Sequence, residues 1–245
     1  MNGTPRPLAH VTVAEAATTA LFNAIVDGTL APGTHLRLKD LAEQFGLSMM
    51  PMREAVRRLE ALGLVELEPH RGAFVRPKTL ADLQSTYATR RLLEGEAAAQ
   101  AAEAFTEAEA SLARRALDDL DRCLAAGDTE HARDAHERFH FTIYHASASP
   151  WLVRSITPLW RNAERYRLES LRPASLAKRR AREHDAILAA VVAGDAEAAR
   201  KRMDEHLCYS MDLAVLAFEE AEASAPRASN AAFPGAGRTS EVMSW

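Results

Sequence analysis

Four of the nine histidines in the sequence are candidates for a metal site. His136 and His140 are four residues apart in helical sequence, so both imidazoles lie on one face of the helix, within reach of a single ion. His184 and His206 lie in two later helical segments. A lone histidine pair at this spacing is most often a surface or packing pair, so these residues alone do not establish a metal site.

A second pattern with possible chemistry is a pair of arginines. Arg53 and Arg57 project from one face of a helical segment whose other face is apolar and carries Met52 and Leu59. A helix that is buried on one side and basic on the other suits the major groove of DNA. Arginines on a helix more often form only a solvated face, so the surrounding elements must decide between the two interpretations.

Three short helices are predicted around these arginines. Apolar residues at helical spacing over 17–25 predict a first helix that stops before Gly28. A second short helix is predicted over 38–45. Ser48 then caps the third helix, in whose first turn the missing N–H of Pro51 costs little.

A hairpin follows the third helix. Residues 65–68 and 73–76 alternate in polarity like two strands, and residues 69–72 form the turn between them, with Arg71 at the tip. Such a wing can place a cation against phosphates or into a minor groove. The order of elements therefore predicts a winged helix-turn-helix, with double-stranded DNA as its partner.

The local sequences of this first part also match a known pattern over about fifty consecutive residues. The matching segments are IVDGTLAPG (25–33), LAEQFGLS (41–48), PMREAV (51–56), LEALGLV (59–65) and RGAFV (71–75). They resemble the DNA-binding domain of GntR-family transcription regulators. The resemblance implies DNA contacts from the second helix, the recognition helix and the wing tip.

Carried over position by position, these contacts fall on Lys39, Met49, Arg53 and the pair Arg71 and Gly72, and the predicted DNA-binding set also includes Ser48 and Arg57. Met49 departs from the family, whose members commonly have arginine at this position. A methionine cannot make a bidentate contact with guanine. We therefore expect the operator to differ at one base pair of each half-site.

Length and charge fit a chain of two domains. The 245 residues are 47% hydrophobic and 26% charged, which is typical of a globular protein and excludes a disordered chain. The net charge is −4, but residues 1–78 carry 9 basic and 8 acidic side chains and the remainder 21 and 26, so the acidity belongs to the second part. No apolar run approaches the ~18 residues of a membrane span. Cys123 and Cys208 lack disulfide or metal spacing, which favours the cytoplasm.

The second part is predicted to be entirely helical. Helix-start signals occur at Thr106, Asp128, Ser149, Ser175 and Asp195, which with a helix over 80–103 makes six helices in an antiparallel bundle. The predicted fold class is therefore mainly α, a winged helix-turn-helix followed by this bundle. The predicted divisions are a disordered N-terminus (1–10), the DNA-binding domain (11–78), the helical domain (79–223) and a disordered tail (224–245).

Motifs in the helical part extend the resemblance over about 140 residues. RRLLE (90–94), FH (139–140), EHDAI (183–187), AGDAEAA (193–199) and HL (206–207) look like the FCD effector domain, found in the FadR-like branch of GntR regulators.

Many members of that branch hold a divalent metal through one aspartate and three histidines. The resemblance implies His140, His184 and His206 as ligands, with His136 at the aspartate position; Asp134 is expected to face elsewhere. The site is predicted to survive as four imidazoles, which favour Zn²⁺ or Ni²⁺ over Mn²⁺ or Mg²⁺.

The family resemblance also implies a small carboxylate effector beside the metal. Arg90 matches the family arginine that meets this carboxylate, and Arg161 and Arg165 are weaker candidates. An open metal position opposite a guanidinium suits a carboxylate, through a metal contact and a bidentate hydrogen-bonded pair.

The leading hypothesis is a transcription regulator, expected to be a repressor, that binds a near-palindromic operator as a homodimer and responds to a small organic acid. A metal-dependent hydrolase is an alternative, because histidines around an open metal position could activate water. No HExxH or GxSxG motif accompanies the histidines, which disfavours that alternative. A direct metal sensor with a purely structural metal site is the third possibility.

Overall fold

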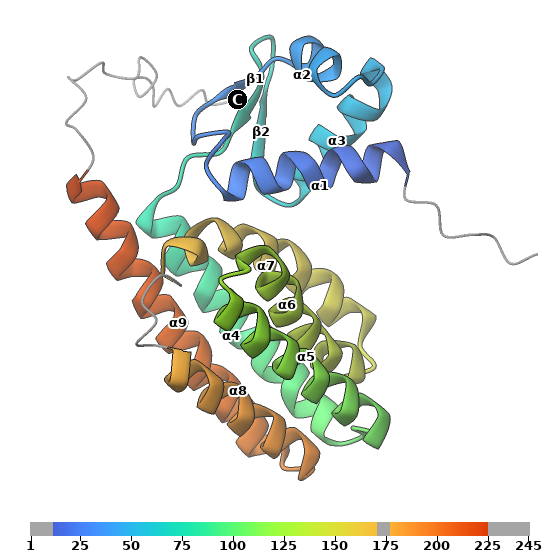
Figure 1. Ribbon diagram of the computed structural model, residues 1–245, viewed down its shortest axis with the longest axis vertical. Coiled ribbons are helices and arrows are strands. Elements are labelled where there is room, and N and C mark those ends of the chain that lie inside the picture. The colour runs from blue at the N-terminus through green and yellow to red at the C-terminus, as the bar shows by residue number, and fades with distance from the viewer. Residues whose placement is uncertain (1–11, 171–176, 225–245) are drawn as a thin grey trace, which may run out of the picture.

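The computed structural model describes residues 12–170 and 177–224, and it has two parts (Figure 1). The first part combines three helices with a small sheet, and the second is a bundle of long helices. Residues 1–11 and 225–245 lie outside the described residues, and so do the predicted disordered segments 1–10 and 224–245, except for Ser224, which is the last residue of α9 (Ala196–Ser224). The segment 171–176, where a helix start is predicted at Ser175, also lies outside the described residues. The mainly α fold class is confirmed.

The first helix, α1 (Val13–Val26), begins with a reciprocal cap. The side chain of Thr12 accepts from the backbone N–H of Glu15, and the carboxylate of Glu15 accepts from the backbone N–H of Thr12. Gly28 follows the helix with a φ of 85°, which suits a glycine. The buried face of α1 packs against α3 (Met49–Ala61).

The helix-turn-helix consists of α2 (Leu38–Gln44) and α3. On α3, Met52, Val56 and Leu59 are buried in the core of the first part, as their spacing predicts. Ser48 stands at the N-cap position with an extended backbone, but its side chain makes no capping hydrogen bond. The predicted side-chain cap at Ser48 is therefore wrong, although the helix begins where it was expected.

The wing is part of a three-stranded antiparallel sheet in the order β1-β3-β2. The strands are β1 (His35–Leu36), β2 (Val65–Glu68) and β3 (Gly72–Val75). Val65 pairs with Val75, and His35 of β1 pairs with Phe74. The sequence places β3 one residue too late and misses β1, because a two-residue strand is too short to show alternation.

In the described stretches of the second part the chain forms six helices, as predicted: α4 (Leu80–Ala102), α5 (Glu107–Ala126), α6 (Thr129–Ala146), α7 (Pro150–Ser170), α8 (Ala177–Val192) and α9 (Ala196–Ser224). Thr106 and Glu109 form the predicted capping box of α5, and Asp128 caps α6. The long helices α4 and α9 lie side by side (Figure 1). Within the described residues, none of the helices is long and apolar enough to cross a membrane. Cys123 and Cys208 are free thiols.

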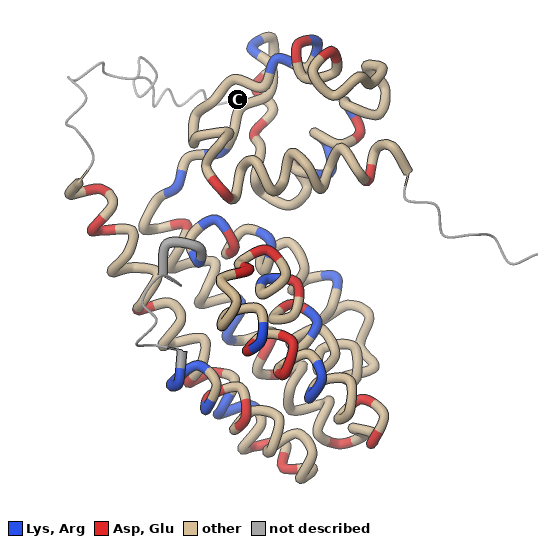
Figure 2. Tube along the Cα trace, viewed as in Figure 1, with Lys and Arg blue, Asp and Glu red and all other residues tan. Residues whose placement is uncertain are grey.

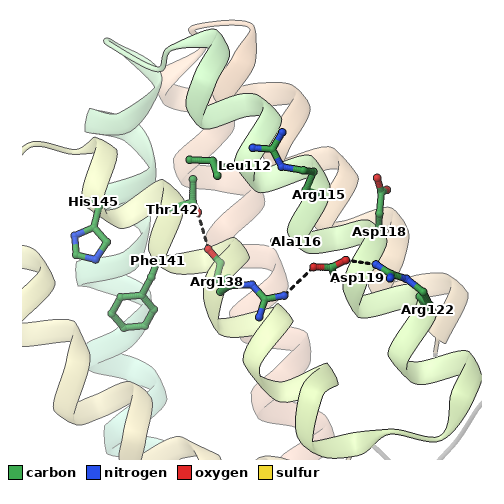
Figure 3. A pocket seen from close by; sticks show the side chains of 10 residues that line it. All are labelled: Leu112, Arg115, Ala116, Asp118, Asp119, Arg122, Arg138, Phe141, Thr142 and His145. Carbon is green, nitrogen blue, oxygen red and sulfur yellow. Dashed lines mark hydrogen bonds and ion pairs between the residues drawn. The ribbon is translucent and has the colours of Figure 1, made fainter. Parts of the chain in front are cut away.

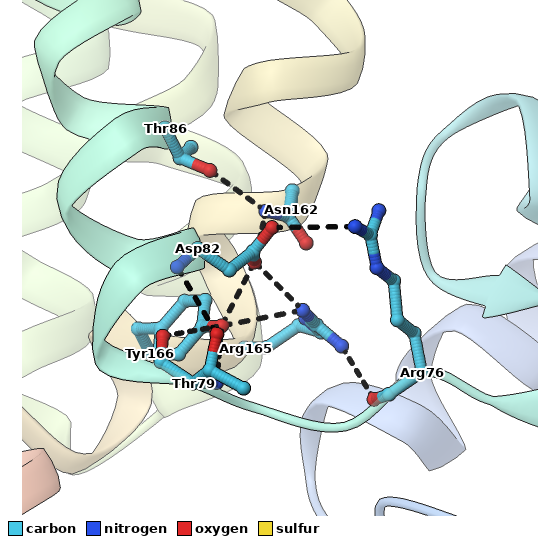
Figure 4. Close-up of polar contacts among 7 residues, drawn as sticks. All are labelled: Arg76, Thr79, Asp82, Thr86, Asn162, Arg165 and Tyr166. Carbon is cyan, nitrogen blue, oxygen red and sulfur yellow. Dashed lines mark hydrogen bonds and ion pairs between the residues drawn. The ribbon is translucent and has the colours of Figure 1, made fainter. Parts of the chain in front are cut away.

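The segment between the two parts is held by α7 (Figure 4). Arg165, whose side chain is almost fully buried, donates to the backbone carbonyl of Arg76 at 2.8 Å and to the carboxylate of Asp82 at 3.1 Å. The hydroxyl of Tyr166 donates to the same carboxylate at 2.9 Å, and burial raises the pKa of Tyr166 to about 12, so this donor keeps its proton. These bonds fix the chain where it leaves the wing and enters α4.

Candidate DNA-binding face and histidine centre

The exposed face of α3 presents the predicted arginines to solvent. Arg53 and Arg57 are exposed, and neither forms an ion pair with any residue of the described ranges. Arg58 differs, because it pairs with Glu54 on its own helix and lies 3.7 Å from Glu15 on α1. Two uncompensated cations on an exposed helix face are suited to phosphates and base edges.

The remaining predicted DNA contacts surround this face. Lys39 on α2 is exposed and lies 3.9 Å from Glu43, which is a weak surface contact. At the start of α3, Met49 is 36% exposed and its neighbour Met50 is 75% exposed. The first turn of the helix therefore offers two flexible apolar side chains, which suit thymine methyl groups better than guanine edges.

The wing tip requires its glycine. Gly72 has a φ of 102°, and a Cβ atom at this position would lie 2.8 Å from Nε2 of His35. The ring of His35 stacks on Phe74 with 4.7 Å between centroids, so making room for a Cβ atom would disturb this stacking. Arg71 pairs with Glu68 and lies over the Phe74 ring at 5.5 Å. His35, which the sequence analysis leaves without a role, shapes the wing.

The structure brings the four predicted histidines together. His136 and His140 come from α6, His184 from α8 and His206 from α9, and all four are buried. One ring nitrogen from each lies within 4.8 Å of the others. We call these four residues the histidine cluster. Asp134 is exposed and faces elsewhere, as predicted.

Two of the histidines are oriented by hydrogen bonds, one directly to a carboxylate and one to a hydroxyl that is itself bound to a carboxylate. Nδ1 of His206 lies 3.1 Å from the carboxylate of Glu183. Nδ1 of His140 lies 3.0 Å from the hydroxyl of Tyr144, which in turn donates to Glu94. Such outer hydrogen bonds leave the Nε2 atoms for a metal and fix the ring orientation. His184 adds an Nε2 atom that is buried and has no hydrogen-bond partner among the described residues.

His136 is held differently, because its partner is an arginine. Nη1 of Arg167 lies 2.7 Å from Nδ1 of His136. A guanidinium can only donate, so Nδ1 of His136 accepts and the proton of the neutral ring lies on Nε2. That Nε2 atom is 3.1 Å from Nε2 of His140, to which it donates. His136 can offer Nε2 to a metal only after giving up its bond to Arg167.

The protonation state of the cluster suits a cation. Burial is the main reason that the pKa values of His136, His140 and His184 lie well below their usual range, and nearby positive charge adds to this effect. The three rings are therefore neutral near pH 7, as metal binding requires. Zn–N bonds of ~2.0–2.1 Å place tetrahedral ligands about 3.4 Å apart, so small side-chain movements would suffice. His140, His184 and His206 could hold a metal after such movements, once Nε2 of His140 is released from His136.

The structure does not bring the predicted effector arginines to the cluster as free guanidiniums. Arg90 is buried in a bidentate pair with Glu94, at 2.6 and 3.2 Å. Arg161 pairs with Glu137 at 2.6 Å and lies over the ring of Phe22 on α1. Arg165 already donates to Arg76 and Asp82 in the segment between the two parts. Arg161 and Arg165 therefore hold the two parts together, which corrects their placement beside the effector.

Several residues around the cluster were missed from the sequence. Trp160 stacks on His136 with 5.3 Å between centroids, and Arg167 is the arginine that touches the cluster. Glu94 follows Arg90 by four residues and Tyr144 follows His140 by four, and this helical spacing was a usable signal. No comparable signal marks Arg167, because its partner lies on another helix.

A separate hollow of about 610 Å³ lies between α5 and α6 (Figure 3). Three of its charged side chains already pair with one another, since Asp119 accepts from both Arg122 and Arg138. It is also lined by none of the four histidines. The histidine cluster is therefore the better candidate for a ligand site.

Comparison with known proteins agrees with both parts of the chain. Residues 13–75 match the family described as bacterial regulatory proteins, gntR family, and residues 85–208 match the FCD domain. The HTH-type transcriptional regulator McbR of Escherichia coli K12 is 31% identical over 208 residues, which cover 84% of this chain and 93% of McbR. A "Probable D-xylose utilization operon transcriptional repressor" of Paenarthrobacter nicotinovorans is 30% identical, over 84% of this chain and 91% of that protein.

The solved structure of E. coli McbR/YncC has the same fold, with a TM-score of 0.73 and 27% identity, over 86% of this chain and all of that chain. These relatives are named as transcription regulators and not as enzymes, which removes the metal-dependent hydrolase from consideration. The chain belongs to the GntR family of bacterial transcription regulators, in the group whose second domain is an FCD domain.

Proposed function

We propose that this regulator is a repressor whose affinity for its operator is controlled by a small carboxylate effector bound beside a divalent metal at the histidine cluster. The observation that carries the proposal is a line of buried polar contacts that runs from the cluster to the DNA-binding part. In this proposal, residues 11–78 bind DNA and residues 79–223 bind the effector. Because its target is genomic DNA, we place the protein in the cytoplasm.

The line of contacts begins at His136 and ends on α1. Arg167 contacts His136 at 2.7 Å and pairs with Glu164 at 2.9 Å on its other side. Glu164 lies 4.0 Å from Nε of Arg133, and Arg133 donates to Oδ1 of Asn23 at 2.9 Å. The side chains of Glu164 and Arg133 are only 6% and 13% exposed, so these charges are weakly screened by solvent.

A hollow at the same junction leaves room for relative movement of the two parts. It measures about 560 Å³ and is lined by Phe22 and Asn23 of α1 on one side and by Arg133, Arg161 and Glu164 on the other. A ligand that changes the position of Arg167 would alter the contacts on one wall of this hollow. Such differential contacts are what a ligand needs to shift the pose of the DNA-binding domain.

The metal is expected to be Zn²⁺, or Ni²⁺, held by His140, His184 and His206, with His136 as a fourth ligand when Arg167 moves away. When bound, it would supply a Lewis-acid contact for the effector carboxylate. The chain's own residues keep the rings neutral, orient them through Tyr144 and Glu183, and exclude water by burial.

On the DNA side, we propose that Lys39, Arg53, Arg57 and Arg71 contact phosphates and bases, with Ser48, Met49 and Gly72 next to the DNA. A homodimer would place two copies of α3 in successive major grooves of a near-palindromic operator. Because phosphate contacts dominate affinity, binding should weaken steeply as salt rises. The test is a footprint and a fluorescence-anisotropy titration on the promoter region of its own gene, with the dimer measured by light scattering. Binding that is insensitive to salt and to sequence would contradict the proposal.

Effector and metal are tested by a thermal-shift screen of small mono- and dicarboxylates, with and without zinc. A ligand at 100 times its Kd stabilises the protein by ~2.7 kcal/mol, which is readily detected. An acid that stabilises only the zinc-loaded protein and weakens operator binding supports the proposal. If none of the acids stabilises either form, the carboxylate effector is rejected.

Direct metal sensing is a second candidate function, favoured by the bond between Arg167 and His136. Arg167 and a metal compete for the same imidazole, so metal binding alone could release Arg167. Under direct sensing, zinc without any acid changes operator affinity. Under acid sensing, zinc alone leaves the affinity unchanged within error.

A further inference from the structure

The first turns of α8 carry a run of basic residues (Figure 2). One of them, Arg180, is unlike its neighbours. Its Nε and Nη1 atoms are buried and have no hydrogen-bond partner among the residues described. Buried donors of a charged group that make no hydrogen bond are unfavourable, so such an arrangement calls for a partner.

Arg180 lies within reach of the cluster. It precedes His184 by four residues on α8, so the two side chains leave the helix on the same face, one turn apart. His184 also has an unpartnered buried atom, Nε2. One short helical face therefore presents two unused donors of a guanidinium and one unused metal-binding nitrogen.

The charge around Arg180 is positive and only partly compensated. Burial first, and then the charge of Arg167, lower the pKa of Arg180 from its usual value, so the two guanidiniums repel each other. The neighbouring acid, Glu183, is engaged by Arg179 at 3.0 Å and by His206 at 3.1 Å. Glu183 and Tyr209 offset only part of this lowering of the pKa, and Arg180 forms no ion pair with any described residue.

We propose that Arg180, facing Arg167, is the residue that binds the carboxylate of the effector next to the metal position at His184. This inference rests on the proposed function and replaces Arg90 as the carboxylate anchor. Arg90 already has its own carboxylate, Glu94, whereas Arg180 has none. A carboxylate could place one oxygen toward His184 and its metal and the other against the guanidinium, in the geometry that arginine recognises best.

The experiment measures anion binding to the full-length, zinc-loaded protein by calorimetry and thermal shift. The probes are citrate, succinate and inorganic phosphate, compared at equal ionic strength. Arg180→Gln removes the charge, and Arg180→Lys keeps it but loses the planar pair of donors. Arg182→Gln is the matched control, because Arg182 lies on the same helix and is exposed.

We expect wild type and Arg182→Gln to bind at least one carboxylate with the same Kd. Arg180→Gln should bind that carboxylate at least tenfold more weakly, and Arg180→Lys should have an intermediate Kd. Zinc affinity should be equal or higher in Arg180→Gln, because a nearby positive charge has been removed. Without anion, Arg180→Gln should unfold at the same or a higher temperature than wild type. This readout confirms that the variant is folded.

The outcomes separate the two proposals. If a carboxylate binds wild type and Arg180→Gln equally, the role of Arg180 is overturned and the carboxylate effector stands. If phosphate binds through Arg180 and neither carboxylate does, the carboxylate class is overturned. If no probe shows saturable binding to the zinc-loaded wild type, both proposals fail.

Discussion

The buried pair of Arg90 and Glu94 gives the sharpest prediction about stability. Glu94 is fully buried and Arg90 is 4% exposed, and they share two hydrogen bonds of 2.6 and 3.2 Å. Glu94→Gln keeps the shape of the side chain but leaves the guanidinium charge buried without a counter-charge. Breaking a buried pair in this way destabilises a protein by ~3–5 kcal/mol.

A matched surface pair provides the control. Arg114 and Asp185 are also 2.6 Å apart, but their side chains are 51% and 54% exposed. Solvent screens such a pair, so Asp185→Asn should cost only ~0.2–1 kcal/mol. The double variant Arg90→Met with Glu94→Gln should recover much of the lost stability, because it leaves no charge buried.

The assay is urea unfolding of the metal-free protein, followed by circular dichroism, for wild type and the three variants. Glu94→Gln should also weaken zinc binding by ~10–100-fold, since a single amide oxygen replaces the two carboxylate oxygens that accept from Arg90 and from the Tyr144 hydroxyl, which positions His140. If Glu94→Gln lies within 1 kcal/mol of wild type, or if the double variant is less stable than the single one, the reasoning about this buried charge is refuted.

Three further predictions concern DNA reading and pH. Arg53→Gln should weaken operator binding by ~1–3 kcal/mol in anisotropy titrations, and binding should also depend less on salt if a phosphate contact is lost. An unchanged Kd would show that Arg53 is not in the interface. Met49→Arg should shift preference toward guanine at one position of each half-site in a selection from random DNA, and an unaltered consensus would show that this side chain does not read a base. As pH falls below ~6.5, histidines of the unfolded chain bind protons, whereas the buried rings of His136, His140 and His184 in the folded protein stay neutral because their pKa values are lowered. The metal-free protein should therefore lose up to ~1.4 kcal/mol of stability per pH unit for each ring. Urea unfolding at pH 7.5, 6.5 and 5.5 checks this, and a flat profile would contradict it.

Features that depend on local spacing were predictable from the sequence. The exposed arginines of α3 and the pair His136 and His140 follow from helical periodicity, and the capping box at Thr106 follows from residue type. The addition of His184 and His206 to that pair came from the family resemblance, because spacing within one helix carries no information about another.

The contacts between helices were not predictable in the same way. Arg165 and Arg167 are two residues apart on α7, which turns the side chains by about 200° relative to each other at 3.6 residues per turn. Arg165 therefore faces the inter-domain segment while Arg167 faces His136. The sequence does not reveal how α7 is rotated about its own axis. It therefore could not show which of the two arginines faces the junction and which faces the cluster.

The wing illustrates a second limit. His35 lies in a segment with turn-like sequence, so neither its strand nor its contact with the wing was expected. Its partner Phe74 is 39 residues later, and a pairing across that distance leaves no periodic trace in a two-residue strand. Gly72 was predicted at the wing tip, but its physical reason, the approach of His35, required the fold.

The central claim is that the histidine cluster and the DNA-binding part are energetically coupled through Arg167, Glu164 and Arg133. The most direct measurement is the Kd for the operator with and without zinc and the stabilising acid, in wild type and in Arg133→Gln. We predict that the ligands change the Kd of wild type by at least ~5-fold, as expected for an allosteric coupling of 1 kcal/mol or more, and that the ratio falls toward 1 in Arg133→Gln while acid binding persists. The same ratio in both proteins would contradict the claim.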